Sequence, residues 1–256
     1  MTPDALKTSI SWAEPDRVLL RGYRIRDLIG RVGFGQAAYL LLVGELPDSK
    51  VGNILEAILV SVIDHGPAAP TARATRMVAS TGAPLSAAVA SGLLAVTRFD
   101  GGAIEDCMGV LEEAVGMGLD PFEAATEMVN RHRARGLRIA GFGSRAHQGE
   151  DPRVVRLLAY AAEQGIDGLY VSQLKHLQRA VSQAVERSLP VNIDGAIAAL
   201  LCEIRFPSQA ANGLFLMSRV AGLVAHAVEE QTRNKPLHSV DAEGLVYDGP
   251  PERPIP

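Results

Sequence analysis

Residues 48–67 read DSKVGNILEAILVSVIDHGP and carry the clearest folding signal in the chain. Their apolar side chains recur every three or four residues, the spacing that places them on one face of an α-helix. Asp48 or Ser49 can cap the amino end of that helix, and Gly66-Pro67 can end it. The stretch therefore predicts an amphipathic helix. Its apolar stripe consists of Val51, Ile54, Leu55, Ile58, Leu59 and Val62.

The same signals recur farther along the chain. Asp120-Pro121 and Asp151-Pro152 each place a capping aspartate before a proline, a residue that suits the first position of a helix. Two more apolar stripes run from Leu174 to Val185, ending by Pro190, and from about Ser208 to Glu230. Aromatic residues make up only 5% of the chain, and no segment alternates like a half-buried strand for more than about five residues. We therefore predict an all-α fold.

The composition is that of a globular protein. The 256 residues are 47% hydrophobic and 21% charged, which excludes disordered and fibrous chains. The formal net charge is −4, so no overall positive field attracts nucleic acid or an anionic membrane, and we expect neither as a partner. Residues 246–256 contain four prolines and are expected to form an extended tail.

Other features bear on the compartment and on metals. Two cysteines, Cys107 and Cys202, are too few for a disulfide framework or a zinc site, so a reducing compartment is favoured. The start of the chain does not resemble a signal peptide, and the apolar runs at 39–43 and 87–96 are shorter than the ~20 residues of a membrane span. The six histidines do not fall in ligand spacing. We expect a soluble cytoplasmic protein without a metal.

Three segments at helix ends could carry chemistry. They are DHGP at 64–67, GFGSR at 141–145 and NIDG at 192–195. Helix amino ends bind anions, but each segment alone is more typical of a helix stop or cap. GFGSRA also matches the dinucleotide fingerprint, yet HQGEDP follows it and a charged stretch precedes it, so a strand-to-helix turn is not predicted.

The order of short blocks along nearly the whole chain is more informative than any one of them. The blocks are RGYRIRDL at 21–28, AYLLLVGELP at 38–47, DHGPA at 64–68, SGLL at 91–94, GGA at 101–103, GFG at 141–143, DPR at 151–153, NIDG at 192–195, NGLF at 212–215 and SR at 218–219 with His226. In content and order they resemble the citrate synthase superfamily, and within it the citryl-CoA lyase module that also forms the C-terminal part of ATP citrate lyase.

The resemblance implies an architecture. It implies a citrate synthase-like all-α fold in which residues 1–256 form a single unit with large and small helical subdomains, the small one spanning about 103–205 and inserted in the large one. It implies a homodimer or a dimer of dimers, a coenzyme A thioester as substrate and no metal. A separate citryl-CoA synthetase is a further expected partner.

The resemblance also implies roles for single residues. Asp194 matches the carboxylate that takes a proton from the thioester methyl group or returns it. His65, Arg153 and Arg219 match the groups that hold the carboxylates and carbonyl of the oxo acid. The loop that meets the CoA nucleotide corresponds to Gly141, Phe142, Gly143 and Arg145. Enolisation of a thioester needs a base and an oxyanion donor, and a dicarboxylate suits arginine forks.

Both arginines have a second interpretation. Arg153 can simply pair with Glu150 or Asp151 at a solvated helix start. Arg219 lies among apolar residues, where a charge usually has a partner or a ligand, and we favour the ligand.

Three features depart from the family pattern. Ser144 stands where the family has the histidine of Gly-x-Gly-His; a serine donates a hydrogen bond but does not titrate near neutrality. His147, three residues on, is an alternative acid. Asp100 stands in the substrate-binding position where citrate synthases have a histidine before Gly-Gly-Ala; citryl-CoA lyase modules also lack that histidine. The arginine that the family lends across its dimer is absent from the KPLHS segment at 235–239, and Arg233 and Arg253 are the alternatives.

Three hypotheses follow. The first is a lyase that cleaves citryl-CoA, or a related 3-hydroxy-3-carboxyacyl-CoA, by a retro-aldol reaction with Asp194 transferring the proton. The second is a condensing enzyme of the same superfamily with a changed substrate. The third is a CoA-binding pseudoenzyme that acts on a partner.

Overall fold

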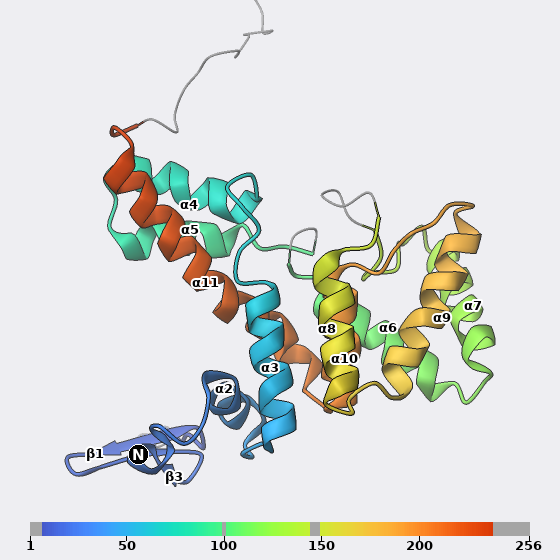
Figure 1. Ribbon diagram of the computed structural model, residues 1–256, viewed down its shortest axis with the longest axis horizontal. Coiled ribbons are helices and arrows are strands. Elements are labelled where there is room, and N and C mark those ends of the chain that lie inside the picture. The colour runs from blue at the N-terminus through green and yellow to red at the C-terminus, as the bar shows by residue number, and fades with distance from the viewer. Residues whose placement is uncertain (1–6, 99–100, 144–148, 238–256) are drawn as a thin grey trace, which may run out of the picture. The chain divides into compact units, whose positions relative to one another are not determined.

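Helices dominate the computed structural model, which describes residues 7–98, 101–143 and 149–237 (Figure 1). Within these ranges the chain forms eleven α-helices and three short strands, which confirms the predicted helical fold. The chain divides into two compact units: unit 1 comprises residues 1–65 and 96–221, and unit 2 comprises residues 66–95 and 222–256. The predicted subdomain of about 103–205 lies wholly within unit 1 and stays a prediction as a separate body, and the predicted tail at 246–256 lies outside the described residues.

Unit 1 begins with a small antiparallel sheet that the sequence did not predict. β1 (Ser11–Glu14) pairs with β2 (Arg17–Leu20), and β2 pairs with β3 (Tyr23–Arg24). The strands have at most four residues and their side chains are exposed or half-buried, so they produce no apolar alternation from which a strand could be predicted.

Three helices of unit 1 begin at predicted capping aspartates, which are Asp48, Asp120 and Asp151. Asp48 accepts a hydrogen bond from Val51 N (2.9 Å), and Asp120 accepts one from Phe122 N (2.9 Å), each at a helix amino end. The elements in chain order are α1 (Ile25–Leu28), α2 (Phe34–Val43), α3 (Ser49–Ser61), α6 (Ile104–Gly116), α7 (Pro121–Ala134), α8 (Pro152–Glu163), α9 (Leu169–Ala184), α10 (Ile193–Glu203) and the first part of α11 (Ser208–Arg233).

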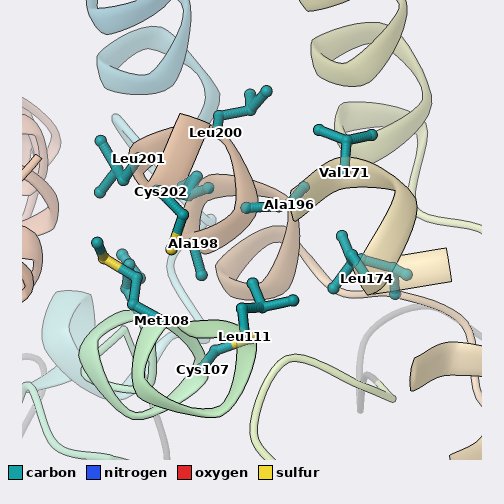
Figure 2. Packing of buried hydrophobic residues seen from close by; sticks show 14 of the residues in the cluster. Cys107, Met108, Leu111, Val171, Leu174, Ala196, Ala198, Leu200, Leu201 and Cys202 are labelled. Atoms are coloured by element: carbon teal, nitrogen blue, oxygen red, sulfur yellow. The ribbon is translucent and has the colours of Figure 1, made fainter. Parts of the chain in front are cut away.

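The core of unit 1 is built around α10. Apart from Asp194 and Glu203, every residue of this helix is buried, and its alanines allow α6 and α9 to pack closely against it (Figure 2). Cys107 and Cys202 both lie in this core as free thiols. The helix that carries Asp194 is therefore held on several sides by packing, which fixes the direction of its amino end.

Unit 2 consists of α4 (Pro70–Ser80), α5 (Leu85–Leu94) and the last part of α11, from Gly222. The helices approach closely at Gly92, where a Cβ atom would collide with the Thr75 hydroxyl and would stand 2.8 Å from a methyl carbon of Leu223. α5 is apolar along most of its length, but among its residues only Ala88 and Gly92 are buried. Much of its apolar surface is thus exposed.

α11 is long and apolar enough to cross a membrane by length and composition. It has 26 residues and a mean hydropathy of 1.3 in its most apolar window, of which 44% is buried inside the protein. The buried side chains include the charged Arg219 and Glu230. Core helices of soluble proteins have the same composition, and the expectation of no membrane partner stays a prediction.

Candidate active site

The amino end of α10 places a carboxylate beside a tight loop. Asn192 caps the helix by accepting a hydrogen bond from Gly195 N (3.1 Å), and Asp194 lies in the first turn with a half-buried side chain. The unpaired N–H groups and the dipole of a helix favour negative charge at this end.

The loop at 141–143 is fastened to the segment that leads into α10. Asn192 N donates to Gly141 O (3.0 Å), and Gly143 N donates to Pro190 O (2.8 Å). Phe142 and Val191 thereby form an isolated antiparallel β-bridge. The side chain of Asn192 adds a bond from Nδ2 to Gly143 O (3.0 Å). Three of the predicted CoA-facing residues are thus brought to the helix end that carries Asp194.

Glycines make this approach possible. Gly141 and Gly143 have φ values of +95° and +78°, which other residues rarely adopt. A Cβ atom on Gly195 would collide with the carbonyl oxygen of Gly141, and a Cβ atom on Gly141 would stand 2.6 Å from Sγ of Cys107. Loop, helix end and the core thiol therefore form one closely packed layer.

Arg219 is buried in α11 with a 2% exposed side chain. Its guanidinium carbon lies 4.7 Å from the centre of the Phe215 ring, a cation–π arrangement. Gly101 lies against the same ring, and a Cβ atom there would collide with it. The neighbouring Ser218 donates its hydroxyl hydrogen to Leu59 O in α3, which fixes this turn of α11. Phe215 ends the NGLF block at 212–215, but the sequence assigned it no role, although its position four residues before Arg219 was a usable signal.

Arg153 forms a two-pronged pair with Asp151. Nε lies 3.0 and 3.2 Å from the two carboxylate oxygens and Nη2 lies 2.6 Å from one of them, while Asp151 also accepts from Arg153 N (2.9 Å). This is the alternative pairing that the sequence allowed, but the carboxylate of Asp151 is not solvated, because its side chain is 2% exposed. The pair uses the Nε–Nη2 edge of the guanidinium, so substrate binding by Arg153 would use the Nη1 side.

The remaining predicted residues are His65, Arg233 and several that lie outside the described part of the chain. His65 has an exposed side chain and lies just beyond the end of α3, before Gly66, whose φ is +79°. Ser144, Arg145, His147 and Asp100 lie outside the described residues, as does Arg253. Arg233, an alternative for the arginine lent across a dimer, is exposed and pairs with Glu229 (2.7 Å).

Metal binding and surface hollows add nothing to this site. Among residues 7–98, 101–143 and 149–237, no three His, Cys, Asp or Glu side chains are grouped to hold a metal ion. Hollows of about 610 Å³ beside α7 and about 700 Å³ beside the β1–β3 sheet contain none of the predicted site residues.

Comparison with known proteins shows the family to which this chain belongs. Residues 47–239 match the family model described as citrate synthase, C-terminal domain. The structure is similar to citryl-CoA lyase from Hydrogenobacter thermophilus, with a TM-score of 0.90 and 38% identity over 98% of this chain and 97% of that one. It is also similar to ATP citrate lyase from Methanothrix soehngenii, solved with citrate and coenzyme A, with a TM-score of 0.85 and 25% identity over 98% of this chain and 43% of that one.

A curated relative extends the comparison. A probable ATP-citrate synthase of Dictyostelium discoideum is 27% identical over 241 residues, which are 88% of this chain and 36% of that protein. This chain therefore spans about a third of the length of the curated relative.

Proposed function

This chain belongs to the citrate synthase family, and from that premise we propose that it cleaves citryl-CoA, or a related 3-hydroxy-3-carboxyacyl-CoA, to acetyl-CoA and oxaloacetate or a related 2-oxo acid. The observation that carries this proposal is the likeness to a citryl-CoA lyase over almost the full length of both chains. The second support is a carboxylate at a helix end beside a fixed glycine loop.

The reaction is a retro-aldol cleavage. The bond between the hydroxyl-bearing carbon and the thioester methylene breaks, and its electrons form the enolate of acetyl-CoA while the alcohol becomes the ketone of the oxo acid. Asp194 enters this step as the carboxylic acid, gives its proton to the enolate carbon to complete the methyl group, and is reprotonated from water afterwards. Ser144, in the position of the family's histidine, hydrogen-bonds to the oxygen at the reacting carbon, and the proton of the hydroxyl group passes to water or to His147.

The charged side chains hold the rest of the substrate. Arg219, Arg153 and His65 hold the carboxylates and carbonyl of the oxo-acid half. Asp100 occupies a further substrate-binding position of the family pattern. Gly141, Phe142, Gly143 and Arg145 meet the CoA half. A buried guanidinium stacked on Phe215 supports this assignment, because it is held in one orientation and binds an anion with little further loss of freedom.

The test is steady-state cleavage of citryl-CoA, followed by release of oxaloacetate and of acetyl-CoA. Asp194→Asn should lower kcat by ~10²–10⁴-fold, the usual contribution of a general acid or base. Asp48→Asn is the matched control, since it makes the same change at the start of α3, where asparagine still caps, and should leave kcat unchanged.

Each other outcome has a meaning. Release of acetyl-CoA from a related 3-hydroxy-3-carboxyacyl-CoA, but not from citryl-CoA, would replace the substrate by that acyl-CoA. Turnover only in the condensing direction would favour the changed-substrate condensing enzyme. CoA binding without turnover of any thioester would overturn the lyase and favour the pseudoenzyme.

We further propose that the protein works as a homodimer or a dimer of dimers. The exposed apolar face of α5 supports this, since Leu85 and Leu94 are 41% and 85% exposed and such surfaces on soluble proteins are usually covered by a partner. Sedimentation of the purified chain tests it, and a monomer at micromolar concentration would contradict it.

A separate citryl-CoA synthetase is proposed as the source of the substrate. A lyase consumes a thioester that some ligation must make, and this chain matches only 36% of the curated ATP-citrate synthase.

A cytoplasmic location and a metal-free reaction complete the proposal. The two buried free thiols support a reducing compartment. Unchanged cleavage after dialysis against a chelator would be the expected result for a reaction without a metal.

A further inference from the structure

We infer that Asn192 is a positioning residue that locks the 141–143 loop to the helix end carrying Asp194, so that the CoA-facing loop and the proton-transfer carboxylate move as one piece. The inference rests on the proposed function for its kinetic part. The geometry that points to it is a side chain that makes two different bonds in two directions.

The first bond belongs to the helix. Oδ1 of Asn192 accepts from Gly195 N at 3.1 Å, which is an ordinary amino-terminal cap. Serine or aspartate can make the same kind of bond, so capping alone does not require asparagine.

The second bond leaves the helix. Nδ2 of Asn192 donates to Gly143 O at 3.0 Å, across 49 residues of sequence. Among the common capping side chains only asparagine both accepts for the helix and offers an amide donor to the loop. Gly143 is otherwise held to this segment by the bond from its N–H to Pro190 O. The side-chain bond therefore fixes Gly143, the last described residue of the loop, which precedes Ser144 and Arg145 in the sequence.

The packing transmits this lock to the carboxylate. Cα of Gly195 lies 3.0 Å from the position that a Cβ atom of Gly141 would occupy, so the first turn of α10 and the loop are in direct contact. A loop that loses its Asn192 bond can move relative to Asp194. Misplacement of reacting groups by about 1 Å is enough to lower rates ~100-fold.

Two variants separate the lock from the cap. Asn192→Ser and Asn192→Asp both keep an oxygen that caps Gly195 N, and both remove the amide group that donates to Gly143 O. The serine hydroxyl can donate, but its single oxygen sits on a shorter side chain and is occupied by the cap, so it does not also reach Gly143 O. The two variants differ in charge, because only the aspartate places a carboxylate against that carbonyl. Asp48→Ser, a change of cap at α3, is the matched control.

The first measurement is amide hydrogen exchange, which needs no activity. In both variants the Gly143 amide should exchange ~10-fold faster, the effect of losing about one hydrogen bond, while the Gly195 amide keeps its wild-type rate. Equal acceleration at Gly143 and Gly195 would show fraying of the helix end and would overturn the lock. Unchanged exchange at Gly143 would overturn it as well.

The second measurement is citryl-CoA cleavage. Both variants should raise KM for citryl-CoA ~5-fold or more and lower kcat ~10–100-fold, whereas Asp48→Ser changes neither. A variant that merely folds poorly lowers kcat through its active fraction and leaves KM unchanged. A defect in Asn192→Asp alone would assign the effect to charge and overturn the positioning role. If the wild-type chain does not cleave citryl-CoA, the proposed function fails, and hydrogen exchange still decides whether the lock exists.

Discussion

Gly195 in the first turn of α10 lies directly against Gly141, and a Cβ atom on Gly195 would stand 3.0 Å from Cα of Gly141 and would collide with its carbonyl oxygen. The carbonyl of Gly141 in turn accepts the bond from Asn192 N. The helix end and the loop can therefore approach this closely only because Gly195 has no side chain.

Gly195→Ala should impair the protein although alanine favours helices. Alanine stabilises a helix interior by about 1 kcal/mol relative to glycine, but the methyl group would push the 141–143 loop away from Asp194. We expect a net loss of ~1–3 kcal/mol in the free energy of unfolding and a fall in kcat for citryl-CoA cleavage. Urea unfolding and steady-state kinetics measure both.

Gly109→Ala is the control for this change. Gly109 lies inside α6, and a Cβ atom there would meet no described atom within 4 Å. The substitution should raise the free energy of unfolding by up to ~1 kcal/mol and leave kcat unchanged. Equal effects of the two substitutions would contradict the role assigned to the contact between Gly195 and Gly141.

The helix signals were readable in the sequence because capping and apolar spacing are local. Asp48, Asp120 and Asp151 cap helices where the sequence predicted them. The pairing of loop 141–143 with 190–192 was not predicted, since it joins segments that are far apart in sequence and leaves no periodic pattern. The β1–β3 sheet was missed for the related reason that its short exposed strands bury no apolar face.

In the candidate site, too, local features were predicted from the sequence and contacts between side chains were not. Asp194 was assigned through the resemblance, and its place in the first turn of α10 follows from the cap at Asn192. The sequence left two roles open for Arg153, because the same residues are compatible with pairing to Asp151 and with binding of a substrate. Only the structure shows that Asp151 is buried and makes the pair.

The ring of Phe215 should matter for substrate binding through Arg219. Phe215→Leu keeps an apolar side chain but removes the face on which the guanidinium stacks, a contact worth about 0.5–2 kcal/mol. We expect a roughly 2–30-fold higher KM for citryl-CoA, since Arg219 loses one of the contacts that orient it. Phe206→Leu is the matched control, because Phe206 is about as buried in unit 1 and packs at a tilt against the ring of Tyr39 instead. An equal rise of KM in both variants would assign the effect to core packing.

The buried pair of unit 2 should be a major contributor to its stability. Arg76 donates from Nε and Nη2 to Glu230, both at 2.8 Å, and Glu230 is 1% exposed. Arg76→Leu leaves a buried carboxylate without this partner and should cost ~3 kcal/mol of unfolding free energy. Arg233→Leu removes an exposed pair and should cost less than ~1 kcal/mol. Urea denaturation that gave equal midpoints for the two variants would contradict this.

The two thiols should resist alkylation in the folded protein. Burial raises the pKa of Cys202 to about 12 and raises that of Cys107 as well. A raised pKa leaves little of the reactive thiolate at pH 8, and burial blocks access, so labelling should begin only when the chain opens. Native protein should consume no thiol reagent at pH 8, and protein unfolded in guanidinium should consume two equivalents.

A third thiol at an exposed position calibrates that measurement. Val60→Cys places one at a 66% exposed site on α3 and should react at the rate of a free cysteine. Because Sγ of Cys107 lies directly beneath Gly141, an alkyl group there cannot fit while the loop is in place, and any chain labelled at Cys107 should lose citryl-CoA cleavage. Rapid labelling of native Cys107 without loss of cleavage would contradict both the burial of the thiol and its packing under the loop.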